Sequence, residues 1–551
     1  MFNRLLFLIL SISISSSLFS QKLKKADKAI VANLQSYVSY LADDKLEGRR
    51  AGTNGEKLAR EYISAQFEKA GLKPKGANNT WFQPFDINDG KQVNSASHII
   101  INGYDLKLDK EYFPLSYSPN GNAEAAVELA LAESGVPWFF DLDDILEQNK
   151  ENPHFDLDDA IKVKAAKAAE KGATSLIIFN SSSIEDKLGF NGKDRSEPAK
   201  IPVLYITKAA RKQYLGDESA TYDIKLKTDI GDKKRIGNNV IGFLDNGAAS
   251  TIVLGAHYDH LGYGEDGNSM IRNSTEKLIH NGADDNASGT AALIELASLL
   301  KQSKQKNSNF LFIAFSAEEL GLNGSKFFTE NPTIDLSTVN YMLNMDMLGR
   351  LNDSSKALTI GGYGTSPVWG EIFSLPANKK YFTIKYDSSG SGPSDHTSFY
   401  RKDIPVLFLF TGLHSDYHKP SDDADKINYI GELQIVKYIV GVIESTSKKG
   451  KLAFTKTREV QMGTSTRFSV TMGIMPDYTF NGAGVRVDGV SDDRPAKKAG
   501  IKTGDIIMQL GDFNTSSMET YMQALSKFKK GDKAKVKFKR GAETVEAEVV
   551  F

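Results

Sequence analysis

The feature that most constrains the fold is a set of short apolar runs without polar alternation. FLFIAF ends at Phe315 and VLFLF ends at Phe410, and both runs are apolar at every position. Successive side chains of a strand point to opposite faces of a sheet, so such runs are typical of strands that are covered on both faces. Helical patterns such as Thr290–Leu300 separate them. We therefore predict an α/β domain with a mostly parallel sheet between helices.

The length of the chain predicts more than one domain, because 551 residues exceed the roughly 250–300 residues at which single cores usually stop growing. The layered pattern occupies residues 21–111 and 231–447. Residues 112–230 interrupt it with a helix and strands of their own, which we interpret as a substrate-shaping lid or as added surface. A basic, polar linker at Lys448–Lys456 precedes a compact β-rich domain at residues 458–551. The strands expected in the layered domain are Val240–Phe243, Thr251–Gly255, Phe310–Phe315, Val339–Asp346 and Pro405–Phe410, and its closing helix is Ile430–Ser445.

The first twenty residues have the pattern of an export signal. One basic residue is followed by an apolar run, Leu5–Leu10, and by small residues up to Ser20. The apolar part is too short for a spanning helix, which needs roughly 20 apolar residues, whereas a cleaved signal fits. We expect an exported chain, periplasmic or secreted, that begins near Gln21 and has no stable membrane insertion. An uncleaved anchor is the alternative.

Charge and cysteine content exclude several classes of function. The formal net charge is -1, so no electrostatic reason favours nucleic acid or an acidic membrane as a partner. The chain contains no cysteine, which excludes disulfides, thiolate ligands and a cysteine nucleophile. Any metal must therefore be held by His, Asp and Glu.

Two amphipathic helices are expected before the first strand, around a Gly-rich turn. Leu34, Val38 and Leu41 recur at helical spacing, and a similar pattern follows the turn. The helices are expected to cover a sheet. Arg49 and Arg50, within the turn, are expected to be solvated charges.

Candidate metal ligands follow the expected strands. Ligands bind beyond the carboxyl ends of strands in open α/β sheets, so side chains far apart in the sequence can meet there. His98, His154 and His280 lack such a context and are interpreted as structural or surface residues. The candidates are His257 and Asp259, Asp284 and Asp285, Glu318 and Glu319, Asp346, and Tyr417 and His418.

Histidines and carboxylates without thiolates suit zinc and, less well, manganese or cobalt. A carboxylate able to bridge suggests two ions about 3.5–4 Å apart, which together activate water and polarise a carbonyl. Of two adjacent glutamates, one can bind metal while its neighbour takes a proton from the bound water. The pattern therefore indicates a hydrolase.

Six ordered motifs resemble those of the M28 family of zinc aminopeptidases, and the resemblance covers Tyr40 to Ser445 apart from the insert. It implies a zinc-exopeptidase-like sandwich. YLADDKLEGRRAGTNGE also resembles the segment that precedes these motifs in many members. The six motifs are GAHYDH, GADDNASGTAAL, SAEELGLNGS, NMDMLG, SGPSDHTSF and DYHKPSDDADKI.

The resemblance implies a role for each candidate. His257 and Asp346 would bind one zinc, Glu319 and His418 would bind the other, and Asp285 would bridge them. Glu318 would be the general base, Asp259 would orient His257, and Tyr417 would donate to the developing oxyanion. Three alternatives stay open at this point: Asp284 as the bridge, His396 in place of His418, and His260 in place of His257. Asp395 and His396 are expected to shape the pocket.

Two further segments resemble known domains. The insert, through AAEKGATSLIIFN and IPVLYIT, resembles a protease-associated (PA) domain. Residues 458–551 resemble a PDZ domain of the bacterial protease type, with Met472–Met475 at its carboxylate-binding loop and KAGIKTGDIIMQLGD as its clearest stretch. Such a loop can capture the terminus of a peptide or protein chain, although a PDZ domain that only packs on the enzyme is the alternative.

Together these features predict an exported dizinc metallopeptidase that hydrolyses N-terminal residues from peptides. Two kinds of alternative stay open. One is a carboxypeptidase, dipeptidase or glutaminyl cyclase on the same scaffold, and the cyclase is expected to need one zinc. The other is a binding protein that has lost the chemistry.

Overall fold

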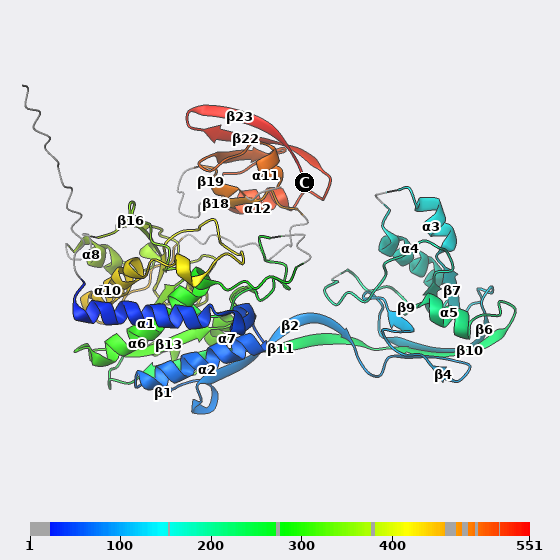
Figure 1. The fold of residues 1–551 in the computed structure, drawn as a ribbon, viewed down its shortest axis with the longest axis horizontal. Coiled ribbons are helices and arrows are strands. Elements are labelled where there is room, and N and C mark those ends of the chain that lie inside the picture. The colour runs from blue at the N-terminus through cyan, green and yellow to red at the C-terminus, as the bar shows by residue number, and fades with distance from the viewer. Residues whose placement is uncertain are drawn as a thin grey trace, which may run out of the picture. The chain divides into compact units, whose positions relative to one another are not determined.

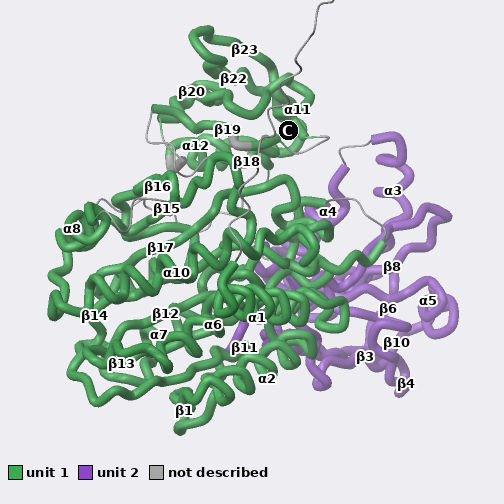
Figure 2. Tube along the Cα trace, turned by 60° about the vertical axis from the view of Figure 1, so that its left-hand side comes forward, with its two compact units in different colours: residues 1–85, 237–551 green, residues 86–236 purple. Residues whose placement is uncertain are grey.

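The computed structural model describes residues 23–152, 155–194, 196–271, 276–375, 381–457, 470–476, 483–490, 494–516 and 518–551. The predicted export signal and His154 lie outside these ranges. Figure 2 colours two compact units: residues 86–236 form unit 2, and the other residues form unit 1. The predicted insert, 112–230, lies within unit 2, which is longer at both ends. Within the described ranges, no helix has the length and apolar character needed to cross a membrane.

A nine-stranded sheet forms the centre of unit 1 (Figure 1). Its four middle strands, β13, β12, β14 and β17, run parallel to one another, and β11 and β15 flank them in antiparallel orientation. The prediction of a mostly parallel sheet is confirmed. In spatial order the strands are β1 (Lys73–Pro74), β11 (Ile230–Leu244), β13 (Asn309–Phe315), β12 (Thr251–His257), β14 (Val339–Met345), β17 (Val406–Phe410), β15 (Ala357–Gly361) and β16 (Thr383–Tyr386), while β2 (Phe82–Val93) pairs with β11.

Helices cover both faces of this sheet, as the apolar runs predict. Along β13, Phe310 and Phe312 belong to one hydrophobic cluster, whereas Leu311 and Phe315 belong to another on the opposite face. The first cluster is covered by α1 (Lys25–Leu41), α2 (Asn54–Lys69), α6 (Gly289–Gln302), α8 (Val368–Ser374) and α10 (Tyr429–Thr446). The second is covered by α7 (Asn323–Glu330) and α9 (His396–Tyr400).

The two helices predicted before the first strand are confirmed as α1 and α2. The buried residues of α1 are Leu34, Val38 and Leu41, the three apolar positions whose spacing predicted the helix. Their side chains join the first hydrophobic cluster, and α1 packs against α6 and α10. Burial of this apolar stripe stabilises α1 more than helix propensity does.

The segment predicted as a linker, Lys448–Lys456, includes residues that pack on unit 1. Leu452 is buried in the core of unit 1, and its N–H donates to Oδ1 of Asn340 at 2.7 Å. The ring of Phe454 packs on Tyr400 with centroids 5.6 Å apart. Two apolar residues among the lysines thus anchor the segment, although they form no periodic pattern.

Unit 2 contains two four-stranded sheets. One has the order β4 (Tyr104–Asp105), β3 (His98–Ile101), β10 (Thr221–Thr228) and β6 (Gly121–Glu128). The other has the order β5 (Tyr112–Pro114), β9 (Val203–Ile206), β8 (Ser175–Phe179) and β7 (Pro137–Asp141). Its helices are α3 (Asp143–Asn149), α4 (Leu157–Glu170) and α5 (Lys208–Tyr214). The helix and both strands predicted for the insert appear as α4, β8 and β9.

The C-terminal segment is β-rich and has its own hydrophobic cluster, which includes Val487, Ile507 and Val536. Its strands are β18 (Ile474–Pro476), β19 (Val485–Val490), β20 (Ile506–Leu510), β21 (Phe513–Asn514), β22 (Lys533–Arg540) and β23 (Glu543–Val550), and its helices are α11 (Pro495–Lys498) and α12 (Met518–Leu525).

Candidate metal centre

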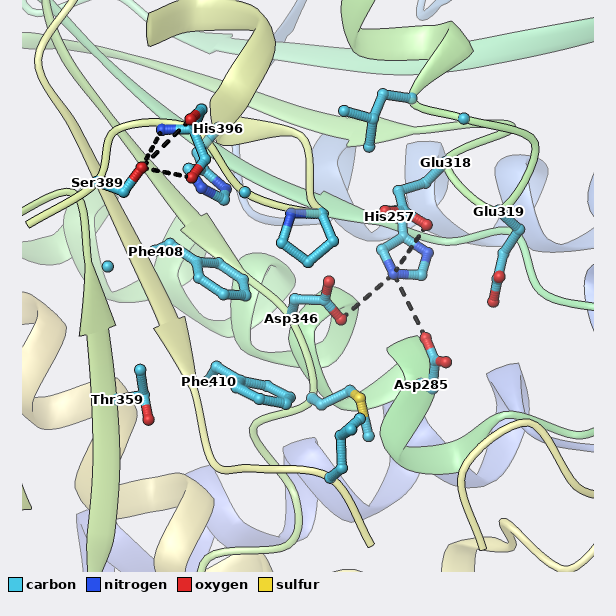
Figure 3. A pocket seen from close by; sticks show the side chains of 18 of the residues that line it. His257, Asp285, Glu318, Glu319, Asp346, Thr359, Ser389, His396, Phe408 and Phe410 are labelled. Carbon is cyan, nitrogen blue, oxygen red and sulfur yellow. Dashed lines mark hydrogen bonds and ion pairs between the residues drawn. The ribbon is translucent and has the colours of Figure 1, made fainter. Parts of the chain in front are cut away.

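The candidate ligands lie at the carboxyl ends of adjacent parallel strands. β12 ends at His257, and Asp346 directly follows β14. Glu318 and Glu319 follow β13 after a short turn. Because these strands pair in parallel, their carboxyl ends share one edge of the sheet. Figure 3 shows these four side chains together with Asp285 at this edge.

His257 presents Nε2 to three carboxylates. This atom lies 3.3 Å from Oδ1 of Asp346, 3.4 Å from Oδ1 of Asp285 and 3.9 Å from Oε2 of Glu318. On the other side of the buried ring, Nδ1 lies 3.2 Å from the carbonyl oxygen of Asp259. With its proton on Nδ1, the ring offers the Nε2 lone pair to a metal, as ligating histidines usually do.

A second cluster surrounds Glu319. Nε2 of His418 lies 3.3 Å from Oε2 of Glu319 and 3.2 Å from Oδ2 of Asp285. Nδ1 of His260 lies 2.8 Å from Oε1 of Glu319. His418 has a left-handed backbone with φ 54°, a conformation that costs a non-glycine residue free energy and is concentrated at functional sites. This backbone conformation directs the imidazole of His418 toward the carboxylates of Glu319 and Asp285.

Asp285 belongs to both clusters. Its Oδ1 faces His257, and its Oδ2 faces His418. The neighbouring Asp284 points elsewhere, because its Oδ1 accepts a hydrogen bond from the N–H of Gly349 at 2.6 Å. Of the two carboxylates that the sequence left open as a bridge, Asp285 is the one that reaches both histidines.

The turn before Asp285 requires a glycine. Gly282 has φ 56°, and a Cβ there would lie 2.1 Å from the carbonyl oxygen of Asp285 and 2.4 Å from Cδ2 of His260. Any side chain would displace one of these groups. The N–H groups of Asp284 and Asp285 both donate to Oδ2 of Asp422, at 2.9 and 3.1 Å. The position of the shared carboxylate is therefore fixed from both sides.

Burial and charge oppose each other in this cluster. Burial alone would lower the pKa of His257, but Glu318 and Asp346 raise it well above its usual value. Burial raises the pKa of Glu318 well above its usual value. Burial also disfavours ionisation of Glu319, but His418 and His260 outweigh it and lower its pKa well below the usual value. The pKa values of the two adjacent glutamates are thus shifted in opposite directions.

The donor set fits a divalent cation. Among the described residues, two groups of three side chains bring one ligand atom each to within 4.8 Å of one another. Imidazole and carboxylate ligands without thiolate suit zinc, and a cation would balance the buried negative charge. The two groups are His257 with Asp285 and Asp346, and His260 with Asp285 and Glu319.

The remaining predicted residues lie around the clusters. Oδ1 of Asp259 accepts the N–H of Glu318 at 3.1 Å and lies 3.8 Å from Nδ1 of His257. The ring of Tyr417 stacks on that of His418, with centroids 3.9 Å apart. His396 stacks instead on Phe408 at 4.6 Å, and burial lowers its pKa to about 3. This placement in the cavity wall favours His418 over His396 as the ligand.

The expectation that Arg49 and Arg50 are solvated is wrong. Arg49 is fully buried and donates to the carbonyl oxygens of Tyr258 at 2.8 Å and Gly282 at 3.0 Å, among others. Arg50 forms two hydrogen bonds with Asp266, at 2.7 and 2.8 Å. Their place in a Gly-rich turn is no sign of these contacts, because the carbonyl oxygens of Tyr258 and Gly282 that bind Arg49 and the carboxylate of Asp266 that binds Arg50 are distant in the sequence.

Two other histidines have contacts in the site that the sequence does not indicate. The sequence offers His260 only as an alternative to His257, yet its ring contacts Glu319 of the second cluster. No motif or spacing singles out His414, and its Nε2 lies 3.2 Å from Oδ2 of Asp284. The only available signal for His260 was its position in GAHYDH.

A cavity of about 660 Å³ opens beside the clusters. Figure 3 shows that Phe408 and Phe410 line it on one side of Asp346 and that Thr359 and Ser389 lie farther from the metal cluster. The cavity thus has an apolar middle and a polar end. Its other lining residues include Lys326, Met347, Asp387, Ser391, Pro393, Arg401, Leu413 and Tyr417.

Comparison with known proteins identifies two regions. Residues 239–443 match peptidase family M28, and residues 458–550 match the PDZ domain. The probable lipoprotein aminopeptidase LpqL of Mycobacterium tuberculosis is 28% identical over 47% of this chain and 50% of its own length. Aminopeptidase YwaD of Bacillus subtilis is 27% identical over 55% of this chain and 64% of its own length. The chain thus spans between half and two thirds of these relatives.

Two further proteins are similar to parts of the chain. An aminopeptidase of Pseudomonas aeruginosa is 25% identical over 66% of this chain and 67% of its own length. Among solved structures, the aminopeptidase from Aneurinibacillus sp. strain AM-1 is 23% identical, with a TM-score of 0.42, covering 77% of this chain and 95% of that one. The family matches enclose His257, Asp285, Glu319 and His418 and also cover the C-terminal β-rich segment, so the chain contains a peptidase family M28 domain at residues 239–443 and a C-terminal PDZ domain.

Proposed function

We propose that this chain is an exported dizinc aminopeptidase that removes N-terminal residues from peptides. The observation that carries the proposal is Asp285, whose two carboxylate oxygens face two different histidines, His257 and His418. A site for one ion has no need of a carboxylate shared in this way. The names of the relatives support the aminopeptidase activity, and the pattern of residues 1–20 supports export.

In this proposal His257 and Asp346 would hold one zinc, Glu319 and His418 would hold the other, and Asp285 would be shared by both. Bound zinc would supply Lewis-acid activation of the attacking water and of the scissile carbonyl. The carbonyl oxygen and Oδ1 of Asp259 lie beside Nδ1 of His257, on the side of the ring away from the proposed zinc. Asp259 thus orients the ring, as residues beyond the direct ligands usually do in metal sites.

Glu318 and Tyr417 have separate roles in the proposed reaction. Glu318, a partly buried glutamate with a raised pKa, takes a proton from the attacking water and passes it to the leaving amine. Tyr417, stacked on His418 in the cavity wall, donates a hydrogen bond to the oxyanion that develops on the substrate.

The other two domains would act on substrates or partners. The PDZ domain would bind the terminus of a peptide or protein at Met472–Met475, where Gly473 has a left-handed backbone with φ 76° and β18 pairs with β19. The insert at 112–230 would be a PA-like lid. Neither role is needed for the hydrolysis itself.

A hydrolysis screen tests the activity. The purified protein is incubated with aminoacyl, N-blocked and C-terminal reporter peptides, with and without a chelator. We expect cleavage of substrates with a free amine, its loss with the chelator and its recovery with added zinc. Cleavage confined to N-blocked or C-terminal reporters would replace the aminopeptidase by another exopeptidase. Cyclisation of an N-terminal glutamine with ammonia release, by a chain with one zinc, would indicate a glutaminyl cyclase.

Metal content tests the ligands. Elemental analysis should give two zinc ions per chain, and His418→Ala should reduce this number to one. His396→Ala is the control because His396 lies in the cavity wall, and it should retain both ions. If His260→Ala loses an ion and His418→Ala does not, His260 takes the ligand role assigned to His418.

A further inference from the structure

The end of the cavity that lies away from the metal cluster carries an acidic group. In Figure 3, Thr359 and Ser389 lie on the far side of Phe408 and Phe410 from Asp285. Asp387 lines the same cavity and is tied to this end, because its Oδ1 accepts the N–H of Ser389 at 3.0 Å. A side chain that extends from the metal cluster into this end would pass the two aromatic rings.

Backbone hydrogen bonds hold Asp387 in place. Its N–H donates to the carbonyl oxygen of Ile360 at 3.0 Å, and its carbonyl oxygen accepts the N–H of Tyr363 at 2.9 Å. Asp387 directly follows β16, which pairs with β15 at the edge of the sheet. The carboxylate of Asp387 is therefore positioned by the end of β16, a rigid element of the kind that suits a recognition group.

No positively charged side chain among the residues that the structure describes balances the charge of Asp387. Among the described residues, no Lys, Arg or His lies within 4.0 Å of its carboxylate, and its one hydrogen bond comes from the N–H of Ser389. Burial raises the pKa of Asp387 above its usual value. By contrast, the carboxylate of Asp416 is bound by both Arg350 and Lys426. A partly buried carboxylate without a cation, in the wall of a cavity, is suited to a cationic ligand group.

Building on the proposed aminopeptidase activity, we propose that Asp387 binds the cationic head of an N-terminal Lys or Arg residue of the substrate. The apolar stem of such a side chain would lie along Phe408 and Phe410, and its ammonium or guanidinium group would reach the polar end. Long basic side chains combine an apolar stem with a charged head, and the cavity combines apolar walls with an acidic end. Asp387 would thus determine specificity without taking part in the chemistry.

Two cations also line the cavity, and they define the competing outcome. Lys326 lies on α7, and its Nζ donates to the carbonyl oxygen of Gly321 at 2.7 Å. Arg401 directly follows α9. These helices pack against each other, so the two cations come from the helical wall, whereas Asp387 comes from the edge of the sheet. If the substrate side chain met these cations instead, an acidic residue would be favoured.

The test compares kcat/KM for Lys, Arg, Leu and Glu aminoacyl amides. For the wild type we expect Lys and Arg to exceed Glu by at least tenfold. In Asp387→Asn, the ratio of Lys to Leu should fall by about tenfold to a hundredfold, the range expected when a hydrogen-bonded charged partner is lost. Asp387→Glu should keep the preference for Lys over Glu. Asp403→Asn, which changes an exposed aspartate outside the cavity, is the matched control and should leave all ratios unchanged.

Each result separates the two proposals. Cleavage of aminoacyl amides with an unchanged Lys-to-Leu ratio in Asp387→Asn, or a wild-type preference for Glu, would overturn the role of Asp387 and leave the aminopeptidase intact. Absence of cleavage of every aminoacyl amide by zinc-loaded wild type would overturn both. A melting temperature of Asp387→Asn within the range of the control excludes loss of the fold as the cause of a changed ratio.

Discussion

Nη2 of Arg49 donates a hydrogen bond to the carbonyl oxygen of Gly282 at 3.0 Å, which joins the N-terminal turn to the loop that carries Asp285. The same guanidinium donates to the carbonyl oxygens of Tyr258, at 2.8 Å, and Asn281, at 2.6 Å. Tyr258 follows His257, so one buried side chain supports the backbone beside two proposed ligands. Arg49 is therefore a positioning residue for the metal centre.

Replacing Arg49 should weaken zinc binding as well as stability. Arg49→Met leaves several buried carbonyl oxygens without a donor, each at a cost of about 1–3 kcal/mol. Arg49→Lys keeps the charge but cannot reach all of them. We expect zinc affinity to fall about 10–100-fold in Arg49→Met and less in Arg49→Lys, as measured by competition with a chelator.

Arg211→Met is the matched control for Arg49→Met. Arg211 also binds a carbonyl oxygen, that of Leu215 at 2.6 Å, but it lies in unit 2. This variant should keep its zinc affinity. Wild-type zinc affinity in Arg49→Met would contradict a positioning role and reduce Arg49 to a purely structural residue.

Replacing the carboxylate of Glu318 should remove most of the catalytic activity without loss of bound metal. Glu318→Gln keeps the size of the side chain but cannot accept the proton, so kcat should fall about 10²–10⁴-fold. Zinc content should be unchanged because the proposed ligands are intact. Glu330→Gln, at the exposed end of α7, is the control. A Glu318→Gln variant with wild-type turnover would remove Glu318 as the base.

The sheet, and the edge of it at which the proposed ligands lie, could be predicted from the sequence because both follow from local runs of apolar residues. Apolar runs that end shortly before His257, Glu318 and Asp346 indicate strands and place those residues at one edge. The choice between Asp284 and Asp285 could not be made in this way. It depends on where Gly349, far along the chain, donates its N–H.

Burial of charged groups was the part that the sequence could not predict. Arg49 is indistinguishable from a surface arginine until the loops that accept its hydrogen bonds are folded around it. Leu452 and Phe454 likewise stand in a lysine-rich segment, and only the surface that they cover reveals that the segment is packed. In each case the partner is remote in the sequence and no periodicity signals it.

The loop that carries Tyr417 and His418 should weaken in acid. Burial opposes ionisation of Asp416, but hydrogen bonds from Lys426, Ser421 and Arg350 outweigh burial and lower its pKa to about 2. A carboxylate with a lowered folded-state pKa stabilises the protein above its unfolded-state pKa, and this stabilisation is lost as the pH falls toward 2.

The expected result is a pH-dependent difference between the wild type and Asp416→Asn. At pH 7 the variant should melt at a lower temperature, and about half of the difference in unfolding free energy should be gone at pH 3. Asp403→Asn should show no such trend. A difference that stays constant between pH 7 and pH 3 would show that the carboxylate charge of Asp416 does not stabilise the loop.

Glu432 offers the opposite pH dependence. It lies in the first turn of α10, is fully buried, and neither carboxylate oxygen has a hydrogen-bond partner among the described residues. Burial raises its pKa well above the usual value.

Below its unfolded-state pKa, the carboxyl group of Glu432 is neutral in both the folded and the unfolded state. At higher pH the unfolded chain is favoured, because only in the unfolded chain can this group ionise freely. Glu432→Leu should therefore increase the free energy of unfolding by about 1–3 kcal/mol at pH 8, with a smaller gain at pH 4, in calorimetric melts. Glu444→Leu, at an exposed position of the same helix, should show no such trend, and a destabilised Glu432→Leu at pH 8 would mean that the buried carboxyl group stabilises the fold.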